Sequence, residues 1–153
     1  MANTYTQIYL QVVFAVHGRQ CLITPQHREE LHKYITGIVQ NRDHKMLAIF
    51  CMPDHLHFLA GIKPAMTISD LVRDVKAHSS AFINERGWII GKFRWQEGFG
   101  AFSYSRSQID SVIRYILNQE EHHRKKTFRY EYLKLLEEFD IAFEDRFLFE
   151  WID

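Results

Sequence analysis

Two histidines, His55 and His57, flank a single leucine near the middle of the chain. In an extended strand, side chains alternate between faces, so we expect both imidazoles on one open face while Leu56 and Phe58 enter the core. Imidazole suits several divalent metals, and two nitrogens alone leave a coordination site incomplete. The pair therefore indicates either a metal site that another element completes or two hydrogen-bonded histidines at a strand edge.

A tyrosine and a glutamine, Tyr115 and Gln119, form a second candidate group one helical turn apart. At about 100° per residue, both side chains leave a helix in the same direction, away from the apolar stripe that begins at Ile109. A tyrosine hydroxyl can act as a nucleophile, and a glutamine side chain offers a neutral oxygen ligand. The same placement also suits a tyrosine that packs across a helix interface.

The spacing of apolar residues predicts the elements that position these groups. Alternation predicts strands over 4–16, 46–52, 55–62 and 100–104. Capping residues and helical spacing predict helices that begin after Thr24 and Thr67, a helix over about 107–122 with Ser107 in its cap, and a helix over 129–139. The order β-α-β-β-α-β is typical of the ferredoxin-like α+β fold, with one antiparallel sheet and helices on one face. The tyrosine-bearing helix and a C-terminal tail follow it.

Length and composition are those of one globular domain spanning 1–153. The 153 residues are 46% apolar and 25% charged, which excludes a disordered chain. Two cysteines exclude a disulfide framework, and no apolar run approaches the roughly 20 residues of a membrane helix. Because the chain starts without a basic-then-apolar leader, we expect a cytoplasmic protein.

The net charge of zero hides an asymmetry along the chain. Residues 1–136 carry 18 Lys and Arg against 12 Asp and Glu, a net +6. The acidic tail over 137–153 carries one Arg against seven acids, a net −6. A basic body with an acidic tail is compatible with a polyanionic partner, and solvated charged faces account for it as well.

Three motifs together resemble a known family. They are Met-Pro-Asp-His-Leu-His-Phe-Leu (52–59) with its His-hydrophobe-His pattern, Trp-Gln-Glu-Gly-Phe-Gly-Ala-Phe-Ser (95–103), and Tyr-x-x-x-Gln (115–119). In this order and spacing they resemble the single-tyrosine HUH transposases of the smallest prokaryotic insertion sequences, a superfamily that includes the REP-associated tyrosine transposases. The resemblance extends from the first strand to about residue 149.

This resemblance implies a transposase that cleaves and rejoins single-stranded DNA with hairpin ends. It implies that His55, His57 and Gln119 bind one divalent cation, Mg²⁺ or Mn²⁺, and that no organic cofactor is needed. Tyr115 would attack a phosphodiester, form a 5′-phosphotyrosine and release a 3′-hydroxyl, so that rejoining needs no ATP. A homodimer is also implied, in which the tyrosine helix can complete the partner's site.

Two further groups of residues are candidates for DNA contacts. They are Arg73, Lys76 and Ser79 on the second long helix, as the resemblance implies, and Arg124, Lys125 and Lys126 in the basic run after the third helix. A solvated helix face explains the first group as well, and favourable charge at a helix C-terminus explains the second. Trp95 could stack on an unpaired base or pack in the core.

Other functions either need residues that the sequence lacks or stay open. A histidine-triad hydrolase needs a third histidine where Leu59 stands, and a paired-histidine phosphoesterase needs a second His-x-Ser/Thr motif. Replication initiators and relaxases share HUH chemistry, but their domains are usually longer. A non-catalytic single-strand-binding module on the same fold stays open, as does a domesticated relative that cuts genomic repeats.

Overall fold

The computed structural model describes residues 3–19, 22–144, 146 and 148–149. Its elements are β1 (Tyr9–Ala15), α1 (Pro25–Gln40), β2 (Lys45–Cys51), β3 (His55–Gly61), α2 (Ile68–Arg86), β4 (Gly100–Tyr104), α3 (Ile109–Leu117), α4 (Gln119–His123) and α5 (Phe128–Glu138). The four strands form one antiparallel sheet in the order β2-β3-β1-β4. This topology confirms the expected ferredoxin-like α+β fold.

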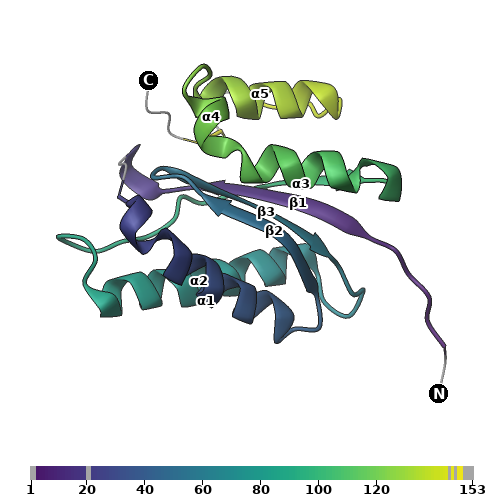
Figure 1. Cartoon of the computed structure of the whole chain (residues 1–153), viewed down its shortest axis with the longest axis horizontal. Helices are drawn as coiled ribbons and strands as arrows, with labels where there is room; N and C mark the ends of the chain where they lie inside the picture. The colour runs from purple at the N-terminus through teal and green to yellow at the C-terminus, as the bar shows by residue number, and fades with distance from the viewer. Residues whose placement is uncertain (1–2, 20–21, 145, 147, 150–153) are drawn as a thin grey trace.

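The helices lie in two layers on opposite faces of the sheet (Figure 1). The first layer contains α1 and α2 and covers one face, as expected, and the second contains α3, α4 and α5. In the second layer, α3 contacts β2 and β3 directly. No helix in the described part of the chain is long and apolar enough to cross a lipid bilayer.

β3 lies inside the sheet, and its alternating side chains enter two separate cores. Leu56 and Phe58 are fully buried among the side chains of α1 and α2, as the alternation predicted. On the other face, Leu59 is buried beneath α3. Because both faces of β3 are covered, His55 and His57 lie inside the protein rather than on an open face.

Local capping decides where the tyrosine-bearing helix begins and ends. Ser105 forms a capping box with Gln108, so the prediction that Ser107 caps the helix was wrong. The backbone of Ser105 is extended and its N–H donates to Gln108 Oε1 at 2.9 Å, whereas Ser107 lies within a 3-10 turn. The predicted single helix is also interrupted at Asn118, where φ is −101° and ψ is 25°. The chain therefore bends between Tyr115 and the glutamine that follows the break.

The C-terminal segment holds α5 in place over the sheet. α5 ends at Glu138, and the rest of the acidic tail is described only for residues 139–144, 146 and 148–149. Phe149 is buried, with its ring 4.9 Å from that of Tyr132 and 6.0 Å from that of Phe128. These contacts fix the N-terminal turns of α5, which carry the acidic residue described next.

Candidate active site

His55 and His57 lie side by side on β3, with exposed fractions of 1% and 0%. The Nδ1 atom of His55 lies 2.7 Å from Asp54 Oδ1, and the Nδ1 atom of His57 lies 2.7 Å from Gln11 Oε1. Since both partners are oxygen acceptors, each ring carries a proton on Nδ1, and its Nε2 atom faces the inside of the site. This hydrogen bonding of the outer nitrogen is the usual support for a metal-binding histidine.

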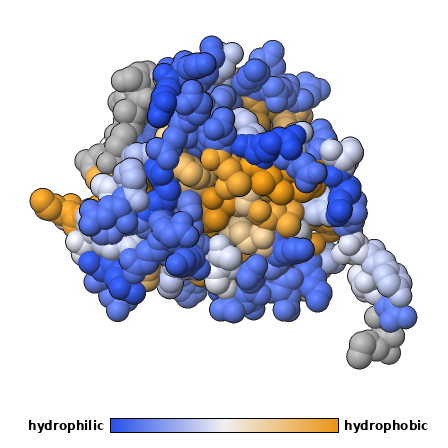
Figure 2. All heavy atoms as spheres, viewed as in Figure 1, coloured by the Kyte–Doolittle hydropathy of each residue, from blue (hydrophilic) through white to orange (hydrophobic). Residues whose placement is uncertain are grey.

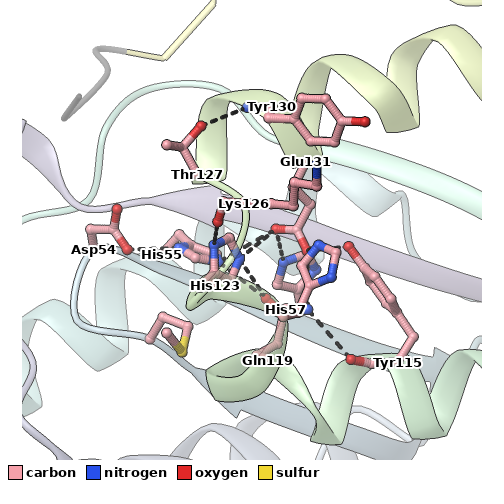
Figure 3. Close-up of polar contacts among 12 residues, drawn as sticks. Asp54, His55, His57, Tyr115, Gln119, His123, Lys126, Thr127, Tyr130 and Glu131 are labelled. Carbon is pink, nitrogen blue, oxygen red and sulfur yellow. Dashed lines mark hydrogen bonds and ion pairs between the residues drawn. The ribbon is translucent and has the colours of Figure 1, made fainter.

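A carboxylate from α5 lies in front of the two imidazoles (Figure 3). Glu131 is only 3% exposed, and its Oε1 lies 3.0 Å from His57 Nε2 and 3.6 Å from His55 Nε2. Each of the three residues offers a ligand atom within 4.8 Å of the other two. The group is therefore compact enough to hold one metal ion.

Tyr115 and Gln119 point at the same carboxylate from the other side (Figure 3). The hydroxyl of Tyr115 donates to Glu131 Oε2, and Gln119 Nε2 donates to the same oxygen at 3.0 Å. The Oε1 of Gln119 lies 3.3 Å from His55 Nε2. All four residues singled out by the sequence thus meet within one chain, although the helix breaks between the tyrosine and the glutamine.

A third histidine closes the site at the turn between α4 and α5. The Nδ1 of His123 lies 2.9 Å from the carbonyl oxygen of Lys126, and its Nε2 lies 3.0 Å from both Gln119 Oε1 and Glu131 Oε1. Its side chain is 9% exposed. In the sequence, His123 only adjoins the basic run that ends at Lys126 and carries no other signal.

The residues that sequence reasoning missed carry weak local signals. Asp54 stands inside the histidine motif, and Gln11 is a fully buried polar residue within an apolar strand, which is unusual unless its side chain is bonded. Glu131 has no such signal, because an acid in an amphipathic helix normally faces solvent. Only the docking of α5 over β3 brings it into the site.

The site contains a charged carboxylate beside a neutral phenol. Burial alone would raise the pKa of Glu131, but the charge of His57 and hydrogen bonds from His123 and His57 hold that pKa well below its usual value. Burial and the charge of Glu131 raise the pKa of Tyr115 well above its usual value. A nucleophilic tyrosine here therefore needs a proton acceptor or an added positive charge.

Of the residues considered for DNA contact, two hold the loop before β4. Lys76 donates to the carbonyl oxygens of Gln96 and Gly98, and burial lowers its pKa to about 8. Ser79 is fully buried and accepts a hydrogen bond from Trp95 Nε1 at 2.9 Å. Trp95 itself is 6% exposed, which supports packing rather than base stacking for its ring.

The other four residues of that group are exposed. Arg73 pairs with Asp70, and Arg124 pairs with Glu121, with arginine side chains that are 68% and 74% exposed. Lys125 and Lys126 are exposed at the turn that follows α4. These cations lie on the surface, outside the buried group around Glu131.

Comparisons with solved structures show the same fold in two transposase-related proteins. A candidate transposase from Deinococcus radiodurans R1 matches with a TM-score of 0.62 and 20% identity, over 78% of this chain and 95% of that one. A REP-associated tyrosine transposase bound to a REP hairpin matches with a TM-score of 0.59 and 16% identity, over 80% of this chain and 73% of that one. No curated protein matched the chain.

The family model described as "Transposase IS200 like" matches residues 4–119. The matched segment contains His55, His57, Tyr115 and Gln119, whereas Glu131 lies beyond its end. Since this match covers most of the sequence and the fold agrees with it, the chain belongs to the family of IS200-like transposases, proteins of DNA transposition and recombination.

Proposed function

We propose that this transposase cleaves and rejoins single-stranded DNA with Tyr115 as its nucleophile. The observation that carries the proposal is the shared carboxylate of Glu131. One of its oxygens faces the Nε2 atoms of His55 and His57, and the other accepts the hydroxyl of Tyr115. The proposed nucleophile and the proposed metal ligands thereby belong to one hydrogen-bonded unit.

The donor set fits a divalent cation, for which we propose Mg²⁺ or Mn²⁺. His55 and His57 would contribute Nε2, and Gln119 and Glu131 would each contribute an oxygen. Without protons or a cation among them, these acceptor atoms would repel one another at the distances observed, 3.0–3.6 Å. When bound, the ion would polarise a phosphoryl oxygen and offset the negative charge that develops there.

The residues of this chain would perform an ester exchange at one phosphodiester. Tyr115 Oη forms a bond to phosphorus, and the bond from phosphorus to the 3′-oxygen breaks, giving a 5′-phosphotyrosine and a free 3′-hydroxyl. Glu131 Oε2 takes the phenolic proton and passes it to the departing 3′-oxygen, so the exchange neither gains nor loses a proton. Because the bond is exchanged rather than hydrolysed, a second 3′-hydroxyl can reverse the reaction without ATP.

For the substrate we propose single-stranded DNA with hairpin ends. A structural neighbour was solved as a REP-associated tyrosine transposase bound to a REP hairpin, which supports this choice. The exposed cations Arg73, Arg124, Lys125 and Lys126 are available for backbone phosphates. No organic cofactor enters this scheme, and the reducing cytoplasm is its expected setting.

We also propose a homodimer that joins through the β2 edge of the sheet. β2 is an edge strand, and Leu47 and Phe50 on it are only partly buried, while Leu117 on α3 beside it is 55% exposed. Figure 2 shows apolar side chains gathered on the viewed face, between hydrophilic surfaces on either side. Each chain already contains all four residues of its site. We therefore propose that the partner subunit binds a second DNA strand rather than supplying residues to the first site.

The test is a denaturing gel of protein mixed with labelled single-stranded hairpin DNA, with Mg²⁺, Mn²⁺ or EDTA. We expect a metal-dependent, protease-sensitive covalent band that Tyr115→Phe abolishes. Tyr5→Phe, at a tyrosine that is 89% exposed, is the matched control and should react normally. An adduct formed by Tyr115→Phe would refute the nucleophile. Tight binding of a verified hairpin without any adduct would favour the non-catalytic binding module.

A further inference from the structure

A cavity between α3 and α5 opens beside Tyr115, and we infer that it binds a nucleobase next to the phosphate that this tyrosine attacks. The inference rests on the proposed function and adds a base-binding site to it. The cavity has a volume of about 590 Å³, which is ample for one base. Tyr115 and Glu131 line it, so the nucleotide bonded to the reacting phosphate lies within its reach.

The lining of the cavity suits a flat, uncharged ring. Val112 and Leu135 are buried apolar residues on its wall, and Tyr104 and Tyr130 add two aromatic rings. Base–aromatic stacking stabilises unpaired bases because every base has a π face. Single-stranded DNA has such unpaired bases, and duplex DNA does not.

Polar groups in the same lining are available to a base edge. Gln108 accepts from the backbone N–H of Ser105 through Oε1 at 2.9 Å, which leaves its amide NH₂ as a donor. The hydroxyl of Tyr104 accepts from Gln11 Nε2 at 2.7 Å and keeps its own hydrogen for another acceptor. Donors of this kind match the ring nitrogens and carbonyl oxygens of bases.

The charge of the lining favours a base over a phosphate. The carboxylates of Glu131 and Glu138 outnumber the one ammonium, that of Lys134, so an anion inside the cavity would be repelled. Lys134 is exposed and makes no hydrogen bond or ion pair with another residue that the structure describes. Its charge is therefore free for the phosphate of the nucleotide whose base enters.

The cavity is also connected to the histidine pair. Tyr104 receives a hydrogen bond from Gln11, and Gln11 Oε1 holds His57 Nδ1 at 2.7 Å. A base that bonds to Tyr104 is thus linked through three hydrogen bonds to the ring proposed to bind metal. One wall is α5, which lies beyond the family match at 4–119, so the cavity depends on the C-terminal part of this chain.

Binding is measured by fluorescence anisotropy with short labelled single strands and the Tyr115→Phe protein, which keeps the ring but forms no adduct. Ser111→Trp fills the cavity from α3 and should weaken binding roughly tenfold. Glu137→Trp adds the same side chain on an exposed position of α5 outside the lining and should leave affinity unchanged. Because a bulky residue can disturb α3, a second measurement replaces one base at a time by an abasic site. We expect a roughly tenfold loss at one position beside the cleaved phosphate.

The outcomes separate this inference from the proposed function. If wild-type protein forms the Tyr115 adduct, but Ser111→Trp binds as tightly as Glu137→Trp and the abasic scan is flat, the base site is refuted alone. If wild-type protein neither binds single strands nor forms the adduct, both are refuted.

Discussion

Replacing Glu131 by glutamine removes one charge from the centre of the site while keeping its shape. In the present structure the carboxylate is 3% exposed and contacts His57, His123, Tyr115 and Gln119. Glu131→Gln keeps one oxygen, so we expect a stability loss of only about 1 kcal/mol. Its affinity for Mn²⁺ should fall roughly 10- to 100-fold, the range found even for residues that merely support metal ligands.

A leucine at the same position separates packing from charge. Glu131→Leu leaves the Tyr115 hydroxyl and the Gln119 amide without their common acceptor. Each buried unsatisfied group costs about 1–3 kcal/mol, so we expect a total near 3 kcal/mol. In a protein of this size that lowers the Tm by roughly 6–12 °C.

The assay is calorimetric titration of Mn²⁺ into each variant, with thermal melts in EDTA. Glu137→Gln makes the same chemical change at an exposed position on the same helix and serves as the control. Wild-type affinity for Mn²⁺ in Glu131→Gln would show that the carboxylate is no ligand. A melt unchanged in Glu131→Leu would contradict the hydrogen-bonding account of the site.

Three further predictions concern the scaffold. Burial lowers the pKa of His32 to about 4, so below pH 6.5 the unfolded chain takes up this proton first and stability is lost as pH falls towards 4. After allowance for solvent screening, urea unfolding of wild type should lose roughly 2 kcal/mol more over this interval than His32→Leu, and equal pH slopes would contradict it. Ser79→Ala strands the buried indole N–H of Trp95 and should cost about 1–3 kcal/mol in the same assay, and an unchanged midpoint would refute that role. Gly100→Ala puts a Cβ 2.7 Å from the Tyr132 hydroxyl, so we expect a loss of roughly 1–3 kcal/mol in the free energy of unfolding and a Tm lower by several degrees. A variant Tm equal to that of wild type would show that α5 can shift to make room.

Much of the fold could be predicted because short-range spacing reports which side of an element is buried. The alternation around Phe58 identified the core face of β3, and the strand predicted over 100–104 is β4 as observed. The same geometry put Tyr115 and Gln119 on one side of their helix. Both side chains do reach a single carboxylate, although the helix is interrupted between them at Asn118.

What could not be predicted depends on contacts between distant segments. Local sequence gives no reason for Glu131 to be buried, and its position follows only from α5 folding back over β3. For the same reason the histidine face was expected to be open. The cap at Ser105 was missed on a smaller scale, because a 3-10 turn over Arg106–Gln108 precedes α3 and places the capping residue two positions before Ser107.

The presence of tyrosine, glutamine and both histidines in one site of one chain bears on how the protein could work when it is scarce. A site divided between two copies requires an encounter before each cleavage, so its output per molecule falls as the protein is diluted. A site contained in one chain has no such dependence for the first cut. Under the function proposed above, strand cleavage would then proceed with very few molecules in a cell, and only the pairing of two DNA ends would remain sensitive to abundance.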